Sequence, residues 1–233
     1  KDSIKILNNY FKDWQVKESK NFTVSITKTK KKIILIDKPT AAQSELRIGH
    51  FSTGRNSKDF YAKTILNSIL GGQFSSRINL NLREDKGFTY GAHSNFNYNA
   101  AGGSFVVSTS IKTENTAEAI KEILFELDNI KDSVTQEELD FAKSYLIRRY
   151  PSLFETYTQM ASNISLLPIF NLPVNYFENY ITEINKVTID EVANAAKHNI
   201  NFEELITVIV GNKKLVKEQL TKFDSFNTEL KEI

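Results

Sequence analysis

Two runs of aromatic and β-branched residues, joined by a short glycine-containing stretch, constrain the fold of this chain more than any other feature. The runs cover residues 88–98 and 104–111, and residues 99–103 connect them. Aromatic and β-branched residues favour strands, and a short turn-forming connection between two strands is typical of a β-hairpin. Because the strands of a hairpin pair antiparallel, the chain is expected to contain an antiparallel sheet.

The remaining predicted elements come in groups rather than as alternating strands and helices. Further strands are predicted at residues 33–36, 42–51 and 205–210, with a weak alternating pattern at 22–26. Helices are predicted at residues 1–16, 59–70, 76–85, 114–130, 136–149, 151–167, 175–184, 189–198 and 213–222. Hairpin strands and helices that follow one another favour an α+β fold, with a largely antiparallel sheet and helices packed on one face.

Short sequence signals mark several helix boundaries. Thr135 with Glu138, and Thr188 with Glu191, form capping-box patterns, in which a hydroxyl and a carboxylate satisfy free N–H groups at the start of a helix. Pro151 is expected to kink or break the helical run that it follows, because proline lacks an N–H group and clashes with the preceding turn.

The chain is expected to form one domain with an N-terminal extension. Its 233 residues suffice for one large domain. No internal repeat and no linker-like or low-complexity segment divides it. Ile4, Leu7 and Phe11 fall on one face of the helix predicted at its start. We therefore assign residues 1–30 to an N-terminal helix and connection, and residues 31–233 to a single domain.

Composition excludes several classes of protein. Lys and Arg number 30 against 28 Asp and Glu, for a net charge of +2, whereas a nucleic-acid-binding domain usually carries a strongly basic face. No nucleic-acid partner is therefore expected. The absence of cysteine rules out disulfides, thiol catalysis and cysteine-type zinc sites. No apolar run approaches the roughly 20 residues that a membrane-spanning helix needs, so no membrane span is predicted.

No metal site and no catalytic nucleophile is predicted within the chain. His50, His93 and His198 lie far apart, without the H-x-x-E-H or H-E-x-x-H spacing of zinc peptidases. No G-x-S-x-G motif marks a serine nucleophile. Ser75 or Ser76 is instead expected to cap the helix that follows.

Arg83 and Tyr90 are the candidate functional residues. Arg83 is expected near the end of a helix and Tyr90 early in the next strand, so the turn between them could bring both side-chain tips to one patch. A guanidinium and a phenol both donate hydrogen bonds, which suits a peptide carbonyl or a developing oxyanion. Spacing alone favours a plainer alternative, in which Arg83 pairs with Glu84 or Asp85 and Tyr90 is half-buried in a strand. Alternation would turn His93 to the opposite side.

The glycine pair Gly71-Gly72 has two interpretations. It is expected to end the helix predicted at residues 59–70. It could also let the loop approach a bound peptide closely, because glycine has no side chain to intervene. A phosphate-binding loop is a weak alternative, since no Lys-Ser/Thr pair follows the glycines.

One block of the sequence resembles the second-domain signature of the M16 metallopeptidases, a family that includes pitrilysin, insulin-degrading enzyme and mitochondrial processing peptidase. The block comprises GGQFSSR at 71–77, NLRE at 81–84 and GFTYG at 87–91. Segments on either side also fit this signature, so that the resemblance covers about residues 33–222.

The resemblance implies a fold and two domains with different roles. Members carry duplicated domains of the LuxS/MPP-like metallohydrolase fold, which close over a peptide. The first domain holds zinc with the motif H-x-x-E-H, and the second supplies an arginine and a tyrosine that hold the substrate backbone. Arg83 and Tyr90 match these two in type and spacing. The zinc motif is missing here, so the resemblance implies a half without metal ligands or catalytic residues, inactive by itself.

The resulting prediction is the substrate-gripping half of a zinc-dependent metalloendopeptidase that acts on peptides or unfolded protein segments. Zinc would come from an upstream domain in cis or from a homologous catalytic subunit in trans. The helix at residues 2–14 resembles the end of such a preceding domain or the connection from it. The alternatives are a catalytically dead scaffold of the same fold and a peptide-binding module acting alone. Composition rich in Asn, Lys and Ile suggests a bacterial source, and bacterial relatives work in the cytoplasm or the periplasm.

Overall fold

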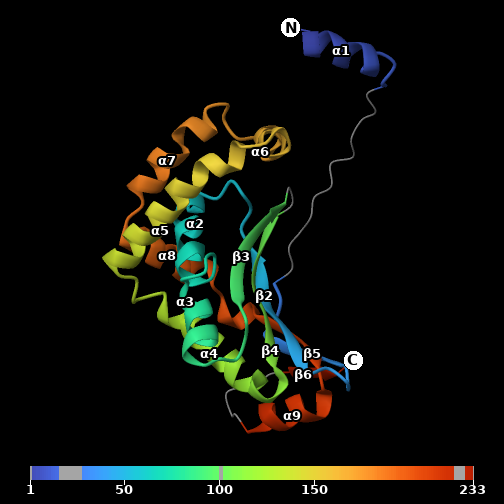
Figure 1. Cartoon of the computed structure of the whole chain (residues 1–233), viewed down its shortest axis with the longest axis vertical. Helices are drawn as coiled ribbons and strands as arrows, with labels where there is room; N and C mark the ends of the chain where they lie inside the picture. The colour runs from blue at the N-terminus through green and yellow to red at the C-terminus, as the bar shows by residue number, and fades with distance from the viewer. Residues whose placement is uncertain (1, 16–27, 100–101, 223–228, 233) are drawn as a thin grey trace.

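A six-stranded sheet forms one layer of the structure, a computed structural model that describes residues 2–15, 28–99, 102–222 and 229–232. The strand order in this part of the chain is β3-β4-β2-β5-β1-β6 (Figure 1). The strands are β1 (Lys32–Asp37), β2 (Gln43–Ser52), β3 (Ala92–Asn99), β4 (Gly102–Lys112), β5 (Ile206–Gly211) and β6 (Glu229–Glu232). Pairs from β3 to β5 are antiparallel, and β5–β1 and β1–β6 are parallel. The predicted sheet and its hairpin, β3–β4, are confirmed.

The position of β5 explains why the sheet is not antiparallel throughout. This late strand lies between β1 and β2, so that Val208 has Ile34 on one side and Arg47 on the other. Along its run ITVIV, β5 alternates between partly buried and buried positions, so one of its faces packs into the core. β6, which adds the second parallel pair, was not predicted from the sequence.

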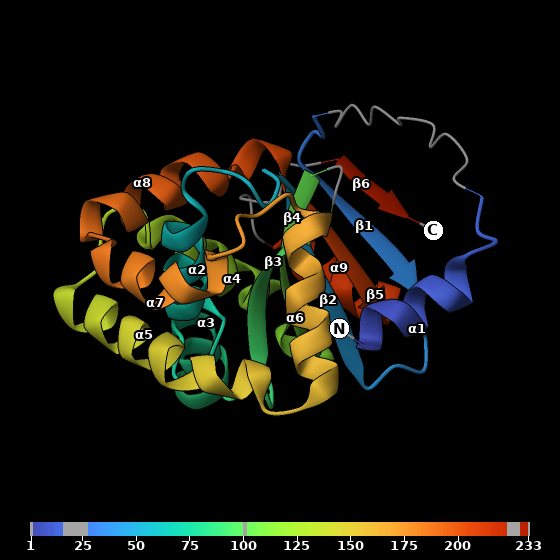
Figure 2. The same cartoon turned by 90° about the horizontal axis from the view of Figure 1, so that it is seen from above.

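Apart from α1, helices form the second layer, on one face of the sheet (Figures 1 and 2). Each predicted helix has a counterpart: α1 (Asp2–Phe11), α2 (Phe60–Leu70), α3 (Arg77–Asn79), α4 (Thr116–Asn129), α5 (Gln136–Arg149), α6 (Tyr157–Ile169), α7 (Tyr176–Lys186), α8 (Ile189–Asn199) and α9 (Lys213–Thr221). α2 packs against β3 and is flanked by α5 and α8. No helix in the described ranges is both long and apolar enough to cross a membrane.

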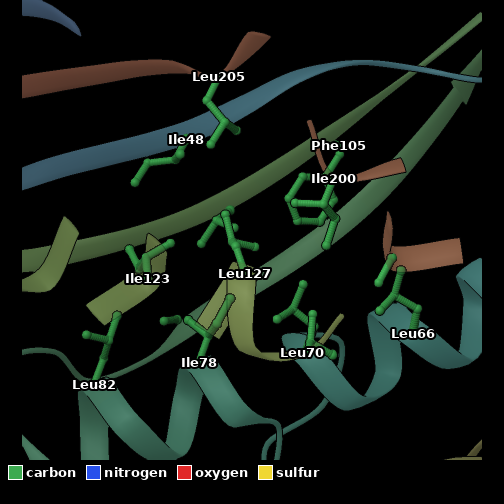
Figure 3. Packing of buried hydrophobic residues seen from close by; sticks show 14 of the residues in the cluster. Ile48, Leu66, Leu70, Ile78, Leu82, Phe105, Ile123, Leu127, Ile200 and Leu205 are labelled. Atoms are coloured by element: carbon green, nitrogen blue, oxygen red, sulfur yellow. The ribbon is translucent and has the colours of Figure 1, made fainter. Parts of the chain in front are cut away.

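The hydrophobic core lies between the sheet and this helical layer. Ile48 of β2 and Phe105 of β4 point toward the helices and are fully buried. Figure 3 shows Leu66 and Leu70 of α2 and Leu127 of α4 meeting them from the opposite side. Each large apolar side chain buried in this way stabilises the fold by roughly 1.5–3 kcal/mol relative to an exposed one. The core therefore fixes α2, and with it the loop that follows α2, against the sheet.

Helix boundaries follow the sequence signals closely. Both predicted capping boxes, at the starts of α5 and α8, are confirmed. Pro151 lies in a 3-10 turn, Tyr150–Phe154, that separates α5 from α6 as predicted. A further capping box, between Thr156 and Gln159, begins α6 and was not predicted from the sequence.

Two local predictions were wrong. β3 begins at Ala92 rather than at residue 88, because Gly87 adopts a left-handed conformation and Phe88 N–H donates to Leu82 O over 2.9 Å instead of joining the sheet. Ser76 occupies the position before α3, but its buried hydroxyl makes no capping bond. The weak strand at 22–26 lies outside the described residues.

An ion pair fixes α3 against the start of α5. Arg77 donates from Nε to Glu138 Oε1 over 2.6 Å and from Nη2 to Oε2 over 2.7 Å, and Nη1 donates to Ser133 Oγ over 2.8 Å. Partial burial acts to raise the pKa of Glu138, but the bonds from Arg77 and Thr135 outweigh it and hold that pKa below its usual value. The pair therefore contributes to stability while Glu138 is ionised.

Arg77→Ala is expected to lower the free energy of unfolding by about 2 kcal/mol at pH 7, the typical worth of hydrogen bonds to a charged group. Since the folded-state pKa of Glu138 is depressed, this contribution is present above the usual value of 4.5 and is lost as pH falls through the folded pKa. Urea unfolding from pH 7 downward measures both effects. Arg148→Ala, on the exposed side of α5, is the control. A difference from wild type that stays constant below pH 4.5 would contradict this role.

Candidate functional site

A hollow of about 760 Å³ lies beside β3, at the edge of the described sheet. Its walls come from α2 and the loop after it, from the helical turn that continues α3, from the segment leading into β3, and from the end of α5. All four residues singled out from the sequence line it: Gly71, Gly72, Arg83 and Tyr90. The fold therefore brings the predicted residues together at one surface.

The loop after α2 lies in direct contact with β3. Gly71 N–H donates to Asn67 O over 2.9 Å, which ends α2, and Gly71 O accepts from Ser94 N–H over 2.9 Å. A Cβ atom at Gly71 would lie 2.5 Å from Ser94 N, and one at Gly72 would lie 2.8 Å from Asn67 O. The backbone could not approach this closely with a side chain present. The predicted end of the helix at this glycine pair is confirmed. The close approach that needs glycine is the packing of this loop against the chain's own strand β3 and helix α2.

The outward edge of β3 is partly occupied by the chain itself. Ala92 N–H donates to Asn79 Oδ1 over 2.9 Å, next to the bond that Ser94 makes with the glycine loop. In an antiparallel edge strand, the backbone groups of alternate residues point the same way. The N–H groups of Phe96 and Tyr98 therefore also point away from β4, along the hollow. An extended polypeptide could pair with this part of the edge.

Arg83 lies on a π-helical turn, Leu80–Asp85, that continues α3. Such wider turns are rare and occur often at functional sites. The guanidinium carbon of Arg83 lies 4.3 Å from the centroid of the Phe74 ring, and Nε lies 3.4 Å from Glu84 Oε1. The side chains of this ion pair are 34% and 52% exposed, and exposed pairs hold a side chain only weakly. The predicted helix-end salt bridge is thus present, while Arg83 still lines the hollow.

Tyr90 lies in the segment before β3 and is 91% exposed. The alternative of a half-buried strand tyrosine is therefore wrong. The backbone around it is held in place: Thr89 Oγ1 lies 2.8 Å from Ser110 O and accepts from Gly91 N–H over 3.1 Å, and Thr109 Oγ1 donates to Gly91 O over 2.9 Å. The backbone that carries Tyr90 is consequently held in place, while its side chain and hydroxyl are exposed to solvent.

Lys63 of α2 forms a buried part of the wall. Its ammonium group donates to Thr53 and, over 2.6 Å, to Ser57 Oγ, and lies 3.4 Å from Asp59 Oδ1. Burial lowers the pKa of Lys63, and the neighbouring Asp59 carboxylate opposes that shift. These contacts account for all three N–H donors, so Lys63 serves the fold rather than a ligand.

The three histidines do not form a zinc site. His50 is held by backbone groups, with Nδ1 2.6 Å from Phe51 O and Nε2 accepting from Asn201 N–H over 3.2 Å. His198 Nδ1 lies 2.7 Å from Asn194 O. Within the ranges that the structure describes, no three His, Cys, Asp or Glu side chains are grouped so as to hold a metal ion. These described side chains therefore do not provide a set of ligands for zinc.

Several wall residues were not predicted. His93 borders the hollow and was not counted among the site residues. It is exposed between the buried Ala92 and Ser94, so it alternates with them along β3. Tyr145 and Arg149 reach the same hollow from α5. No local motif marks these two residues, since only the packing of α5 beside α2 places them there.

Known proteins are similar to this chain in sequence and in fold. A family model described as "Peptidase M16 inactive domain" matches residues 1–146. The crystal structure of a peptidase M16 inactive domain from Pseudomonas fluorescens has a TM-score of 0.75 and 26% sequence identity, and the match covers 84% of this chain and 47% of that one.

Curated relatives are longer than this chain. A Helicobacter pylori protein named "Non-peptidase homolog YmxG" is 29% identical over 160 residues, which are 67% of this chain and 37% of that protein. An uncharacterized zinc protease from Mycobacterium tuberculosis is 25% identical over 183 residues, which are 77% of this chain and 42% of that protein. The chain thus spans less than half the length of these relatives.

Proposed function

The chain belongs to the M16 peptidase family, as an inactive domain, and from this premise we propose that it is the substrate-gripping, non-catalytic half of a zinc-dependent metalloendopeptidase. The zinc site is supplied by an upstream H-x-x-E-H domain in the same chain or by a homologous catalytic subunit. Peptides or unfolded protein segments are the substrates. The observation that carries the proposal is that Arg83 and Tyr90 line one hollow beside a sheet edge that the described chain leaves partly open.

Arg83 and Tyr90 act in this proposal as hydrogen-bond donors to the peptide. Donors that are already in position stabilise charge that develops on a carbonyl oxygen, because the protein need not reorganise during the reaction. The fixed backbone on both sides of Tyr90 supplies such positioning. The weak pairing of Arg83 with Glu84 leaves its remaining N–H groups available. Neither residue needs to take up a proton for this role.

The open part of the β3 edge gives the peptide backbone a second place to bind. Main-chain pairing with a sheet edge contributes affinity with little dependence on sequence. The N–H groups of Ala92 and Ser94 are already taken by Asn79 and the glycine loop. A bound peptide therefore pairs beyond them, toward Phe96 and Tyr98, and passes Tyr90 at the other end of the hollow.

Residues 1–30 form, in this proposal, the connection from the preceding half, and residues 31–233 form the domain. Ile4, Leu7 and Phe11 of α1 are 64%, 53% and 51% exposed, and the Trp14 ring lies 5.3 Å from that of Phe11. A helix of this length is marginally stable in water without a partner surface. The preceding half supplies that surface and covers this apolar stripe.

The intact mass and zinc content of the natural protein, isolated from its source, test this proposal. A chain of about twice the present length that holds one zinc would support the arrangement in cis. A chain of this length bound to a zinc-carrying partner would support the arrangement in trans. The same short chain, alone and free of zinc, would rule out the peptidase proposal.

The second candidate function is a scaffold or peptide-binding module without catalysis. It is favoured by the name of the Helicobacter pylori relative, which describes that protein as a non-peptidase homolog. The two candidates differ in what the complete protein does with peptide. A scaffold has no use for the donor pair Arg83 and Tyr90, so substitution of both would leave its assembly with partners unchanged.

A further inference from the structure

The hollow beside β3 carries an uneven charge. In the described part of the chain, its wall includes Lys63, Arg83 and Arg149 but no Asp or Glu. The chain as a whole is nearly balanced, with 30 basic and 28 acidic residues. The absence of carboxylates from a wall with three cations is therefore a local property of this surface.

Two of these cations are available to a ligand. Arg149 is exposed, and among the described residues its guanidinium makes one hydrogen bond, from Nη1 to Tyr145 OH over 3.2 Å, and has no acidic partner. Arg83 has one weak pair, with Glu84 at 3.4 Å. Lys63 differs from both, because its donors are used within the fold. Arg83 and Arg149 come from different helices, so they can contact different side chains of one peptide.

The same wall carries aromatic surface between these charges. Phe74 lies under the Arg83 guanidinium, with 4.3 Å between the guanidinium carbon and the ring centroid, and Tyr145 lies beside Arg149. Aromatic rings give apolar side chains of a peptide a surface to bury. Carboxylates next to apolar residues are thus the peptide side chains that match this wall.

We propose that the hollow selects peptide segments with Asp or Glu next to apolar residues over segments rich in Lys or Arg. The inference rests on the proposed function, because it names the substrate class of the same site. Opposite charges facing each other across an interface favour the matching ligand, and like charges penalise the wrong one. Arg149 determines this specificity but takes no part in hydrolysis.

The test uses the complete protein with its zinc-carrying half and two fluorogenic peptides that differ only at three positions, Asp in one and Lys in the other. Both kcat/KM and the binding affinity, by fluorescence anisotropy, are measured for each peptide. The Asp peptide is expected to be favoured about tenfold at low salt, the scale of a few charge contacts. The preference is expected to shrink as salt screens these charges.

Arg149→Glu is the variant that isolates the inference, and Arg148→Glu is its matched control. Both residues lie in the last turn of α5 and are exposed, but Arg148 does not line the hollow beside β3. Arg149→Glu is expected to abolish or reverse the preference, whereas Arg148→Glu is expected to keep it. If both variants change the preference equally, overall charge accounts for it and the assignment to this hollow is overturned.

The remaining outcomes separate the inference from the proposed function. Equal cleavage and binding of the two peptides would overturn the selectivity and leave the peptidase proposal standing. Selective binding without cleavage of either peptide by the zinc-loaded protein would overturn the peptidase proposal and support the selectivity. Absence of both binding and cleavage would overturn both.

Discussion

Tyr90→Phe in the complete, zinc-loaded protein is expected to lower kcat about a hundredfold while the free energy of unfolding stays unchanged. The substitution removes one hydroxyl from a residue that is 91% exposed, so no contact of the folded chain is lost. Loss of a single donor to a developing oxyanion costs roughly 3 kcal/mol of transition-state stabilisation. Steady-state kinetics on one fluorogenic peptide, together with urea unfolding, measures the two quantities separately.

Arg83→Ala is expected to lower kcat in the same direction, and Tyr157→Phe provides the control. Tyr157 begins α6, is 90% exposed and does not line the hollow, so its hydroxyl should not affect turnover. If both Tyr90→Phe and Arg83→Ala keep the wild-type kcat, the proposed role of these residues as hydrogen-bond donors to the substrate is contradicted. A decrease that Tyr157→Phe shares would also contradict it, because the effect would then not depend on the hollow.

The exposure of Tyr90 is itself an argument for a role outside the domain. A tyrosine kept for stability would bury its ring, as Tyr176 does at 7% exposure. Tyr90 instead leaves its ring in solvent while hydrogen bonds fix the backbone on both sides. A side chain of this kind adds little to the fold, and its hydroxyl is free to contact a ligand in the hollow.

Much of the fold could be predicted because local pattern and tertiary packing agree. In β2 and β4 the apolar residues alternate, and in α2 and α4 they recur with helical periodicity. In each element these apolar residues are the ones that the fold buries, so the periodicity predicts the elements correctly. The insertion of β5 between β1 and β2 has no local signal, since it depends on how distant segments pair. β6 is a short strand of charged and apolar residues, ELKE, without a clear alternation.

The candidate site also depends on tertiary packing that has no local sequence signal. Spacing alone favoured a salt bridge between Arg83 and its neighbours, and the structure contains that bridge. Spacing does not predict the π-helical turn under Arg83, which packs on α4. Nor does it predict that β3 starts only after Tyr90, which follows from the left-handed Gly87 and the bond from Phe88 N–H to Leu82 O. Arg149 could not be predicted at all, since no sequence pattern links α5 to the segment around Tyr90.

Gly71→Ala is expected to lower the free energy of unfolding by about 3 kcal/mol, at the upper end of the range for overpacking a tight site. The new Cβ would lie 2.5 Å from the backbone nitrogen of Ser94. Backbone cannot rotate away as a flexible side chain can, so the end of α2 would have to move off β3. The bond from Ser94 N–H to Gly71 O, 2.9 Å long, would then break. Urea unfolding measures the loss of stability.

Gly91→Ala is the matched control, because it adds the same methyl group on the same side of the domain. Its Cβ would have Asn79 Oδ1 as nearest neighbour, at an ordinary 3.7 Å, so a change within about 1 kcal/mol is expected. Hydrogen exchange at the Ser94 amide distinguishes the cause: it should accelerate in Gly71→Ala and stay slow in Gly91→Ala. Equal stability of the two variants would mean that the glycine loop can relax without leaving β3. If Ser94 exchanges faster in Gly71→Ala but not in Gly91→Ala, the bond from Ser94 N–H to Gly71 O holds both the edge strand and the wall of the hollow. The absence of a side chain at Gly71 is then what permits this bond.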